Sequence, residues 1–247
     1  MRRGSVWRVP RPRPLLPGPL RVAGAVPLAA CVAVVLAAFA AGRGNPGRLD
    51  AALDPRIQAW LGRFPALLDW LPRLGGLKEV ALMTAALGLA CVATRRWSGA
   101  VLVLVAVPAA IGLTEYVLKP YVGTIINQAF PSGHSTSSFA LAATFAILIA
   151  DPLYRRVPGP LRLLLVLLAQ LVAASVAAAM IAIGAHTFTD AVGGAAVGTG
   201  VVLACALTLD LAVRRAGGPP GTRPVREAGG APAEPVTRPP DAASRQA

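Results

Sequence analysis

The chain has little charge, little histidine and little cysteine for its length. Charged residues make up 14% of its 247 residues, and there are two histidines and three cysteines. A soluble core of this length mixes polar residues into its apolar segments more often. Cys31, Cys91 and Cys205 all lie within apolar runs. That placement argues against a disulfide framework or a cysteine metal site, and it favours small side chains packed between helices.

Lysine is also scarce, since Lys78 and Lys119 are the only lysines among 24 basic residues. The formal net charge is +13, but the arginines do not gather in one patch. They stand in short segments beside the apolar runs, which suits anionic lipid headgroups and the setting of membrane topology. We therefore expect membrane lipids as partners and no nucleic acid.

What the sequence does contain is a series of long apolar runs. Hydrophobic residues make up 55% of the chain. A helix needs about 20 apolar residues to cross a hydrocarbon core of about 30 Å. The pattern predicts an all-α, polytopic membrane bundle of about six transmembrane helices, at residues 22–41, 77–94, 98–118, 133–150, 161–183 and 189–213. We interpret the first run as an uncleaved span, although small residues after it also permit a cleaved signal peptide.

The remaining segments differ in composition. Residues 1–20 are rich in arginine and proline and residues 216–247 lack periodicity, so both are predicted to be disordered and to flank a membrane domain at 21–215. Within that domain, residues 43–76 carry apolar side chains at helical spacing, interrupted by Pro65 and Pro72, with arginines and aspartates on the other face. This segment is predicted to form short amphipathic helices in the membrane interface.

The arginine distribution predicts the orientation. Placing both termini in the cytoplasm puts most arginines of the short loops inside. The loops at 119–132 and 184–188 then face outward. The prediction is a multi-pass protein of the cell membrane, with Lys119, His134, His186 and Asp190 together at its extracytoplasmic surface.

His186 and Asp190 are four residues apart, which places them on one face if the segment is helical. A carboxylate bonded to one imidazole nitrogen fixes the tautomer and leaves the other nitrogen free as base or nucleophile. The alternative is a pair that only caps a span. The two histidines and Asp190 are also possible metal ligands, but no His-x-x-x-His or cysteine pair supports a metal site.

The stretch FPSGHS, residues 130–135, has the pattern of a helix start. Pro131 ends any preceding helix, Ser132 is a good N-cap, and Gly133 allows close backbone approach. The free amides of such a helix start bind anions readily. Lys119 is either a cation for a phosphate or a lysine paired with Glu115 one turn earlier.

Together these residues resemble the type 2 phosphatidic acid phosphatase family, membrane lipid phosphatases related to vanadium haloperoxidases. That family carries Lys, six residues and Arg-Pro; then Pro-Ser-Gly-His; then Ser-Arg, five residues, His, three residues and Asp. The chain has Lys119, an intact Pro-Ser-Gly-His at 131–134, and His186 with Asp190. The resemblance covers roughly residues 22–213.

The chain departs from the family where the motifs place arginine. Ile126 and Asn127 stand in place of Arg-Pro, and Ala179 and Met180 stand in place of Ser-Arg. The family's arginines clamp phosphate oxygens. Two lost hydrogen bonds to a charged group amount to roughly 3–6 kcal/mol, which is about 10² to 10⁴ in rate. Other side chains could take the place of these arginines: the neutral donors Thr124, Asn127 and Gln128, or the arginines Arg56, Arg63 and Arg73 of the amphipathic segment.

The resemblance implies a membrane phosphatase that hydrolyses a lipid phosphate monoester or a polyprenyl (pyro)phosphate without a metal or other cofactor. In it, His186 forms a phosphohistidine, Asp190 orients His186, and His134 protonates the leaving oxygen. Lys119, Ser132 and Gly133 hold the phosphate. The alternatives are a catalytically impaired homologue that binds a lipid headgroup or a membrane partner, and a transporter or structural protein. The sequence leaves the particular lipid and the oligomeric state open.

Overall fold

The computed structural model describes residues 15–16, 25–41, 47–122, 130–150 and 157–217, and all regular structure in them is helical. The all-α prediction is therefore confirmed. Most of both predicted disordered tails lies outside the described residues. The helices are α2 (Ala25–Ala41), α3 (Arg48–Leu61), α4 (Pro65–Leu74), α5 (Leu77–Ala93), α6 (Trp97–Gly112), the π-helix η2 (Leu113–Leu118), α7 (Lys119–Val122), α8 (Gly133–Ala150), α9 (Gly159–Ala182) and α10 (Phe188–Gly217).

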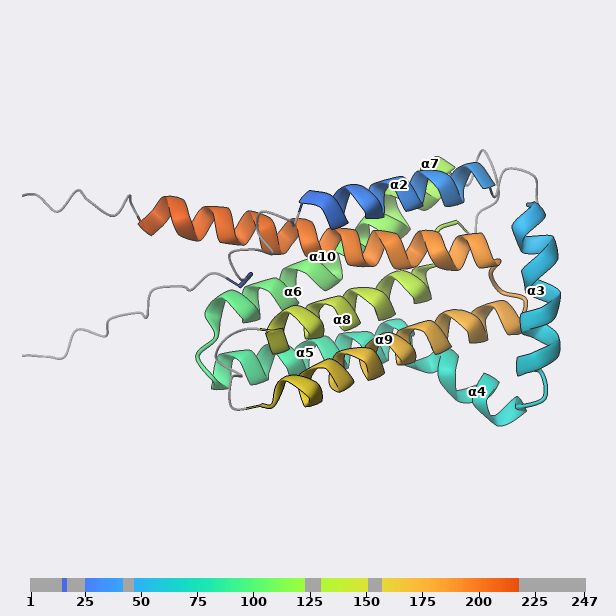
Figure 1. The fold of residues 1–247 in the computed structure, drawn as a ribbon, viewed down its shortest axis with the longest axis horizontal. Coiled ribbons are helices and arrows are strands. Elements are labelled where there is room, and N and C mark those ends of the chain that lie inside the picture. The colour runs from blue at the N-terminus through green and yellow to red at the C-terminus, as the bar shows by residue number, and fades with distance from the viewer. Residues whose placement is uncertain (1–14, 17–24, 42–46, 123–129, 151–156, 218–247) are drawn as a thin grey trace, which may run out of the picture.

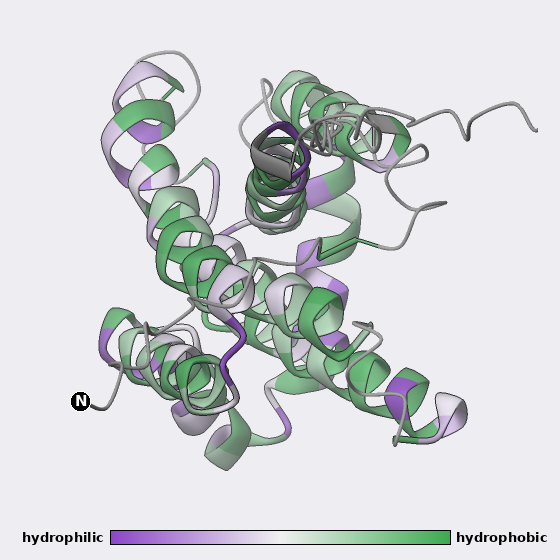
Figure 2. Ribbon diagram, turned by 90° about the vertical axis from the view of Figure 1, so that its left-hand side faces the viewer, coloured by the Kyte–Doolittle hydropathy of each residue, from purple (hydrophilic) through white to green (hydrophobic). Residues whose placement is uncertain are grey.

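Four helical stretches in the described residues are long and apolar enough to cross a membrane: Trp97–Val122, Gly133–Ala150, Gly159–Ala182 and Phe188–Arg215. Helices α4 and α5 meet that test only together, as a pair bent by 55°, which raises the number to five. The apolar helix α2 is shorter. A multi-pass membrane fold follows, and the number of six spans stays a prediction. Apolar residues cover most of the bundle helices (Figure 2).

Helix α8 lies in the middle of the bundle, between α6, α9 and α10 (Figure 1). Its contact with α10 depends on Gly194 and Gly198, which are one turn apart on α10. A Cβ on Gly194 would collide with the carbonyl oxygen of Ser132, and one on Gly198 with that of Thr136. Glycine at this spacing lets two helix backbones approach closely, so the start of α10 is held directly against the start of α8.

The far end of α10 carries a buried carboxylate. Asp210 accepts hydrogen bonds from the amides of Leu15 and Leu16, at 2.6 and 3.0 Å. A carboxylate inside a membrane span needs partners, because lipid cannot solvate it. The helix itself continues to Gly217, four residues past the position 213 at which the apolar run ends.

Helix α3 lies across one end of the bundle, beside the end of α9 and the start of α10 (Figure 1). Both α3 and α4 are helices, with Pro65 at the start of α4 and Pro72 inside it; the interfacial position of residues 43–76 stays a prediction. Of the aspartates in this segment, Asp50 is 2% exposed and Asp69 is exposed, whereas Trp60 is 62% exposed. The part of α3 that carries Asp50 therefore lies against the bundle.

Candidate active site

Two helix starts meet at the end of the bundle that α3 covers. The amide of Ser132, just before α8, donates to the carbonyl oxygen of Asp190 in the first turn of α10 at 3.0 Å. His134 lies within electrostatic range of His186, Lys119 and Glu115. The structure thus brings together groups that are up to about 70 residues apart in sequence, as a consequence of both loops lying at the same end.

Ser132 begins α8 by using both its oxygens. Its Oγ accepts from the amide of Ser135 at 3.4 Å, and its carbonyl oxygen accepts from the amide and the hydroxyl of Thr136, each at 2.9 Å. No acceptor within the described residues takes the amides of Gly133 and His134. This helix start therefore offers two N–H donors and the positive end of the helix dipole to an anion.

A sharp reversal carries the chain from α9 to His186. Gly184 has a φ of +74°, a left-handed conformation that favours glycine. The amides of Ala185 and His186 both donate to the carbonyl oxygen of Met180, at 3.0 and 3.2 Å. This C-terminal cap ends α9 and holds His186 just before α10 begins.

His186 and Asp190 face each other without a hydrogen bond. The imidazole Nδ1 lies 3.7 Å from the Asp190 Oδ2, which is longer than a hydrogen bond, and this buried nitrogen has no other partner in the described residues. The Asp190 Oδ2 accepts instead from the amide of Thr187 at 3.0 Å, and the Thr187 hydroxyl accepts from the amide of Asp190 at 3.3 Å. Asp190 is thus part of a capping box, and a turn rather than a helix face brings His186 to it.

Two carboxylates of α3 complete the cap of α10, and the sequence reasoning missed them. Asp50 accepts from the amide and the hydroxyl of Thr189, each at 2.9 Å. Asp54, one turn later, accepts from the amide of Phe188 at 2.9 Å. Carboxylates of the protein itself therefore accept from the amides at the positive end of α10, whereas at the start of α8 the amides of Gly133 and His134 have no acceptor within the described residues.

The carboxyl of Asp54 is held in an unfavourable electrostatic setting. Burial raises its pKa, the Phe188 amide lowers it, and the nearby carboxylates Asp50 and Asp190 raise it further. The net direction is upward. Ionisation of Asp54 therefore costs folding free energy, unlike that of a typical capping carboxylate.

Lys119 is paired with Glu115, the alternative partner considered from the sequence. The Lys119 Nζ lies 2.7 and 2.8 Å from the two carboxylate oxygens. The same carboxylate lies against Gly133, where a Cβ would collide with it. Glu115 therefore contacts both the cation and the glycine that were predicted to bind phosphate.

No arginine of the described residues makes an ion pair or hydrogen bond with Glu115, His134, His186 or Asp190. The position of the second motif arginine is taken by Met180, which is buried at 6% exposure. The side chain of Arg73 lies over the ring of Trp70, and Arg56 and Arg63 are exposed. The neutral substitutes and the position of the first arginine, all within 123–129, lie outside the described residues. Within those residues no group of three or more His, Cys, Asp or Glu is placed to hold a metal ion.

Comparison with known proteins identifies this arrangement. The family model of the PAP2 superfamily matches residues 70–214, more than half of the chain, including Lys119, both histidines and Asp190. The chain belongs to the PAP2 superfamily. PAP2 membership indicates a phosphatase-type hydrolase acting on phosphate esters, and the apolar helices make this a multi-pass membrane member. No match was found among curated proteins or solved structures. Residues Asp50 and Asp54 lie before the matched region.

Proposed function

We propose that the protein hydrolyses a lipid phosphate monoester or a polyprenyl (pyro)phosphate through a phosphohistidine intermediate. The observation that carries the proposal is the junction of the α8 and α10 starts. At this junction His134 lies in the first turn of α8, whose amides at Gly133 and His134 have no acceptor within the described residues, and His186 and Lys119 lie in electrostatic range of His134. Each group has a defined task in phosphoryl transfer.

In the first step the phosphate lies at the start of α8, against the amides of Gly133 and His134, with Lys119 beside it. His186 attacks the phosphorus as the bond to the lipid oxygen breaks. His134 donates a proton to that leaving oxygen. Asp190 faces Nδ1 of His186, so its carboxylate stabilises the positive imidazole as the bond forms. The 3.7 Å separation has to shorten on substrate binding, as catalytic hydrogen bonds often do.

In the second step His134 takes a proton from water, and the oxygen of that water attacks the phosphorus. The bond between phosphorus and His186 breaks, which releases inorganic phosphate and restores both histidines. Ser132 contributes by capping α8, which fixes the amides that hold the phosphate. These steps need no group beyond the residues named and water.

A catalytically impaired homologue that binds a lipid headgroup or membrane partner is the second candidate. It is supported by the Lys119–Glu115 pair and by Met180 in place of an arginine. A bound phosphate has to displace the Glu115 carboxylate from Lys119. No arginine of the described residues is seen to contact the site residues and hold the phosphate in its place. An enzyme with these features is slow, by about 10² to 10⁴ relative to one with both arginines.

We further propose that the active site faces away from the cytoplasm. Arginines flank the opposite ends of the spans, at Arg95, Arg96, Arg162, Arg214 and Arg215, and the sequence before the first span adds six more. The site end carries the basic residues of 43–78 and Lys119, but three aspartates offset part of their charge, so the balance favours the opposite ends as cytoplasmic. At the site end, exposed Trp60 and Trp70 are suited to the membrane–water interface. The cell membrane is the proposed location.

The proposal is tested by phosphate release from purified protein in detergent. Phosphatidic acid, phosphatidylglycerophosphate and a polyprenyl pyrophosphate serve as substrates, with His186→Ala and His134→Ala as matched variants. We expect release from at least one lipid and its loss in both variants. Equal rates for wild type and His186→Ala on all three lipids contradict the enzyme. Vanadate mimics the pentacoordinate phosphoryl group. A melting temperature that rises with vanadate indicates an intact phosphate pocket, and an unchanged melting temperature indicates that the pocket does not bind phosphate.

A further inference from the structure

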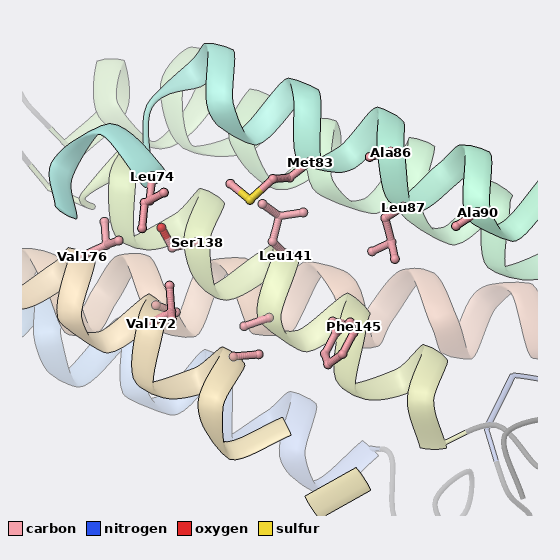
Figure 3. Close-up of a pocket in the computed structure, with 13 residues that line it drawn as sticks. Leu74, Met83, Ala86, Leu87, Ala90, Ser138, Leu141, Phe145, Val172 and Val176 are labelled. Carbon is pink, nitrogen blue, oxygen red and sulfur yellow. The ribbon is translucent and has the colours of Figure 1, made fainter. Parts of the chain in front are cut away.

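An apolar pocket lies beside the proposed active site, between α5, α8 and α9 (Figure 3). Its volume is about 520 Å³, in the range of ligand pockets. Of its 13 lining residues, Ser138 is the one with a polar side chain. The pocket follows α8 from Ser138 to Phe145, a rise of about 10 Å, which is roughly a third of a hydrocarbon core.

The polar end of this pocket adjoins His134. Ser138 follows His134 by one turn of α8, and Gly75 lies against both residues. A Cβ on Gly75 would lie 3.0 Å from the Ser138 Oγ and 3.2 Å from the His134 Cδ2. The ring of His134 and the hydroxyl of Ser138 thus lie near the same glycine.

The hydroxyl of Ser138 lacks a partner. The residue is 8% exposed, and its Oγ makes no hydrogen bond within the described residues. The neighbouring Ser137 shows the contrast, because its hydroxyl bonds to the carbonyl oxygens of Gly75 and His134. The hydroxyls of Thr84, Ser135 and Thr144 are also buried without a partner in the described residues, but Ser138 is the one of the four that lines the pocket. At the polar end of a pocket, it is suited to an oxygen of a ligand.

We infer that this pocket receives one acyl chain of an acylglycerol phosphate, and that Ser138 donates a hydrogen bond to the ester oxygen at the head of that chain. The inference rests on the proposed function and narrows its substrate class. The rise from His134 to Ser138 is about 6 Å, which leaves room for the glycerol carbons between phosphate and ester. A polyprenyl phosphate has no ester oxygen beyond the phosphate, so it leaves Ser138 without a partner.

The first test fills the pocket. Ala86 lines it and Ala85 does not, although both are exposed on α5. Ala86→Trp is expected to reduce kcat/KM for long-chain phosphatidic acid by about tenfold or more, because the indole occupies the space of the acyl chain. A tenfold reduction corresponds to about 1.4 kcal/mol of lost transition-state binding. Ala85→Trp is the matched control. A soluble aryl phosphate without a chain should be hydrolysed equally by both variants.

The second test removes the hydroxyl. Ser138→Ala is expected to reduce kcat/KM for phosphatidic acid by about five- to tenfold while a polyprenyl phosphate is unaffected. Equal losses on both lipids overturn the role of Ser138. Equal rates for the two tryptophan variants on phosphatidic acid, or equal losses by Ala86→Trp on lipid and aryl phosphate, overturn the pocket as the acyl site.

A binding test separates this inference from the proposed function. Phosphatidic acid with a photoreactive group in its acyl chain is added to the His186→Ala variant, and the labelled peptides are mapped. Labelling of α8 around Leu141 and of α9 around Val172, with its loss in Ala86→Trp, supports the pocket even if wild type releases no phosphate. Labelling elsewhere overturns it even if wild type is active.

Discussion

Replacement of Asp50 tests how the start of α10 is held. Asp50→Ala removes the acceptor for both donors of Thr189 and for the amide of Gly47, at 2.9, 2.9 and 3.2 Å. Hydrogen bonds to a charged group contribute about 1.5–3 kcal/mol each, and a negative charge at a helix N-terminus contributes about 0.3–1 kcal/mol. Because the site relaxes in part, we expect the variant to lose about 3–5 kcal/mol of unfolding free energy.

The assay is denaturant unfolding in detergent, followed by tryptophan fluorescence, beside kcat and KM for a soluble aryl phosphate. Asp50→Asn keeps one acceptor oxygen and should lose about half as much. Asp69→Ala is the matched control, since Asp69 is exposed on α4. Because Asp50 acts through the turn that places His186 and Asp190, kcat should fall with little change in KM.

A free energy of unfolding for Asp50→Ala within about 0.5 kcal/mol of that for Asp69→Ala, the range of ordinary surface substitutions, would contradict the role of Asp50 as a cap of α10. A stable variant with unchanged kcat would also show that the α3 cap does not position the site.

Three further predictions concern neighbouring contacts. The raised pKa of Asp54 means that its charge costs stability above the folded pKa and that this cost disappears as the pH falls towards its ordinary value of about 3.9. Asp54→Asn should therefore unfold at a higher temperature than wild type at neutral pH, with a gap that narrows on acidification; a widening gap contradicts this. Glu115→Gln should tighten vanadate binding about tenfold by releasing Lys119 for the anion, and unchanged affinity would show that Glu115 does not compete. Gly194→Ala should lower the melting temperature by several degrees, about 2–4 °C per kcal/mol, because its methyl group meets the backbone before α8; an unchanged melting temperature would mean that the helices have room.

The helices and the position of the histidines could be predicted because they depend on local patterns. Apolar runs gave five bundle helices close to their observed bounds, since lipid requires each span to satisfy its own backbone. Two predicted spans, at 133–150 and 161–183, separate the loop before His134 from the loop that holds His186. Because two crossings return the chain to the same side, both histidines were expected at one end of the bundle. Neither inference needs the packing of side chains.

The cap of α10 by Asp50 could not be predicted, because its partner Thr189 lies 139 residues away. A periodic pattern in 43–76 shows which residues share a helix face, but not whether that face meets water or another helix end. The pocket at Ser138 also depends on packing, because Gly75, which lies near Ser138, comes from the turn between α4 and α5. Glu115 was identified as a partner for Lys119 because both lie one turn apart on one segment.

The most direct test of the account is to trap the covalent intermediate. Protein is mixed with phosphatidic acid carrying radiolabelled phosphate, quenched rapidly in base, and examined for label on the chain, because phosphohistidine survives base and is lost in acid. We predict label on His186 in wild type and none in His186→Ala. With a labelled aryl phosphate, whose leaving group needs no proton from His134, we predict more label in His134→Ala than in wild type, because the variant forms the intermediate but hydrolyses it slowly. Phosphate release by wild type without any labelled His186, or with label that His186→Ala retains, would contradict the account.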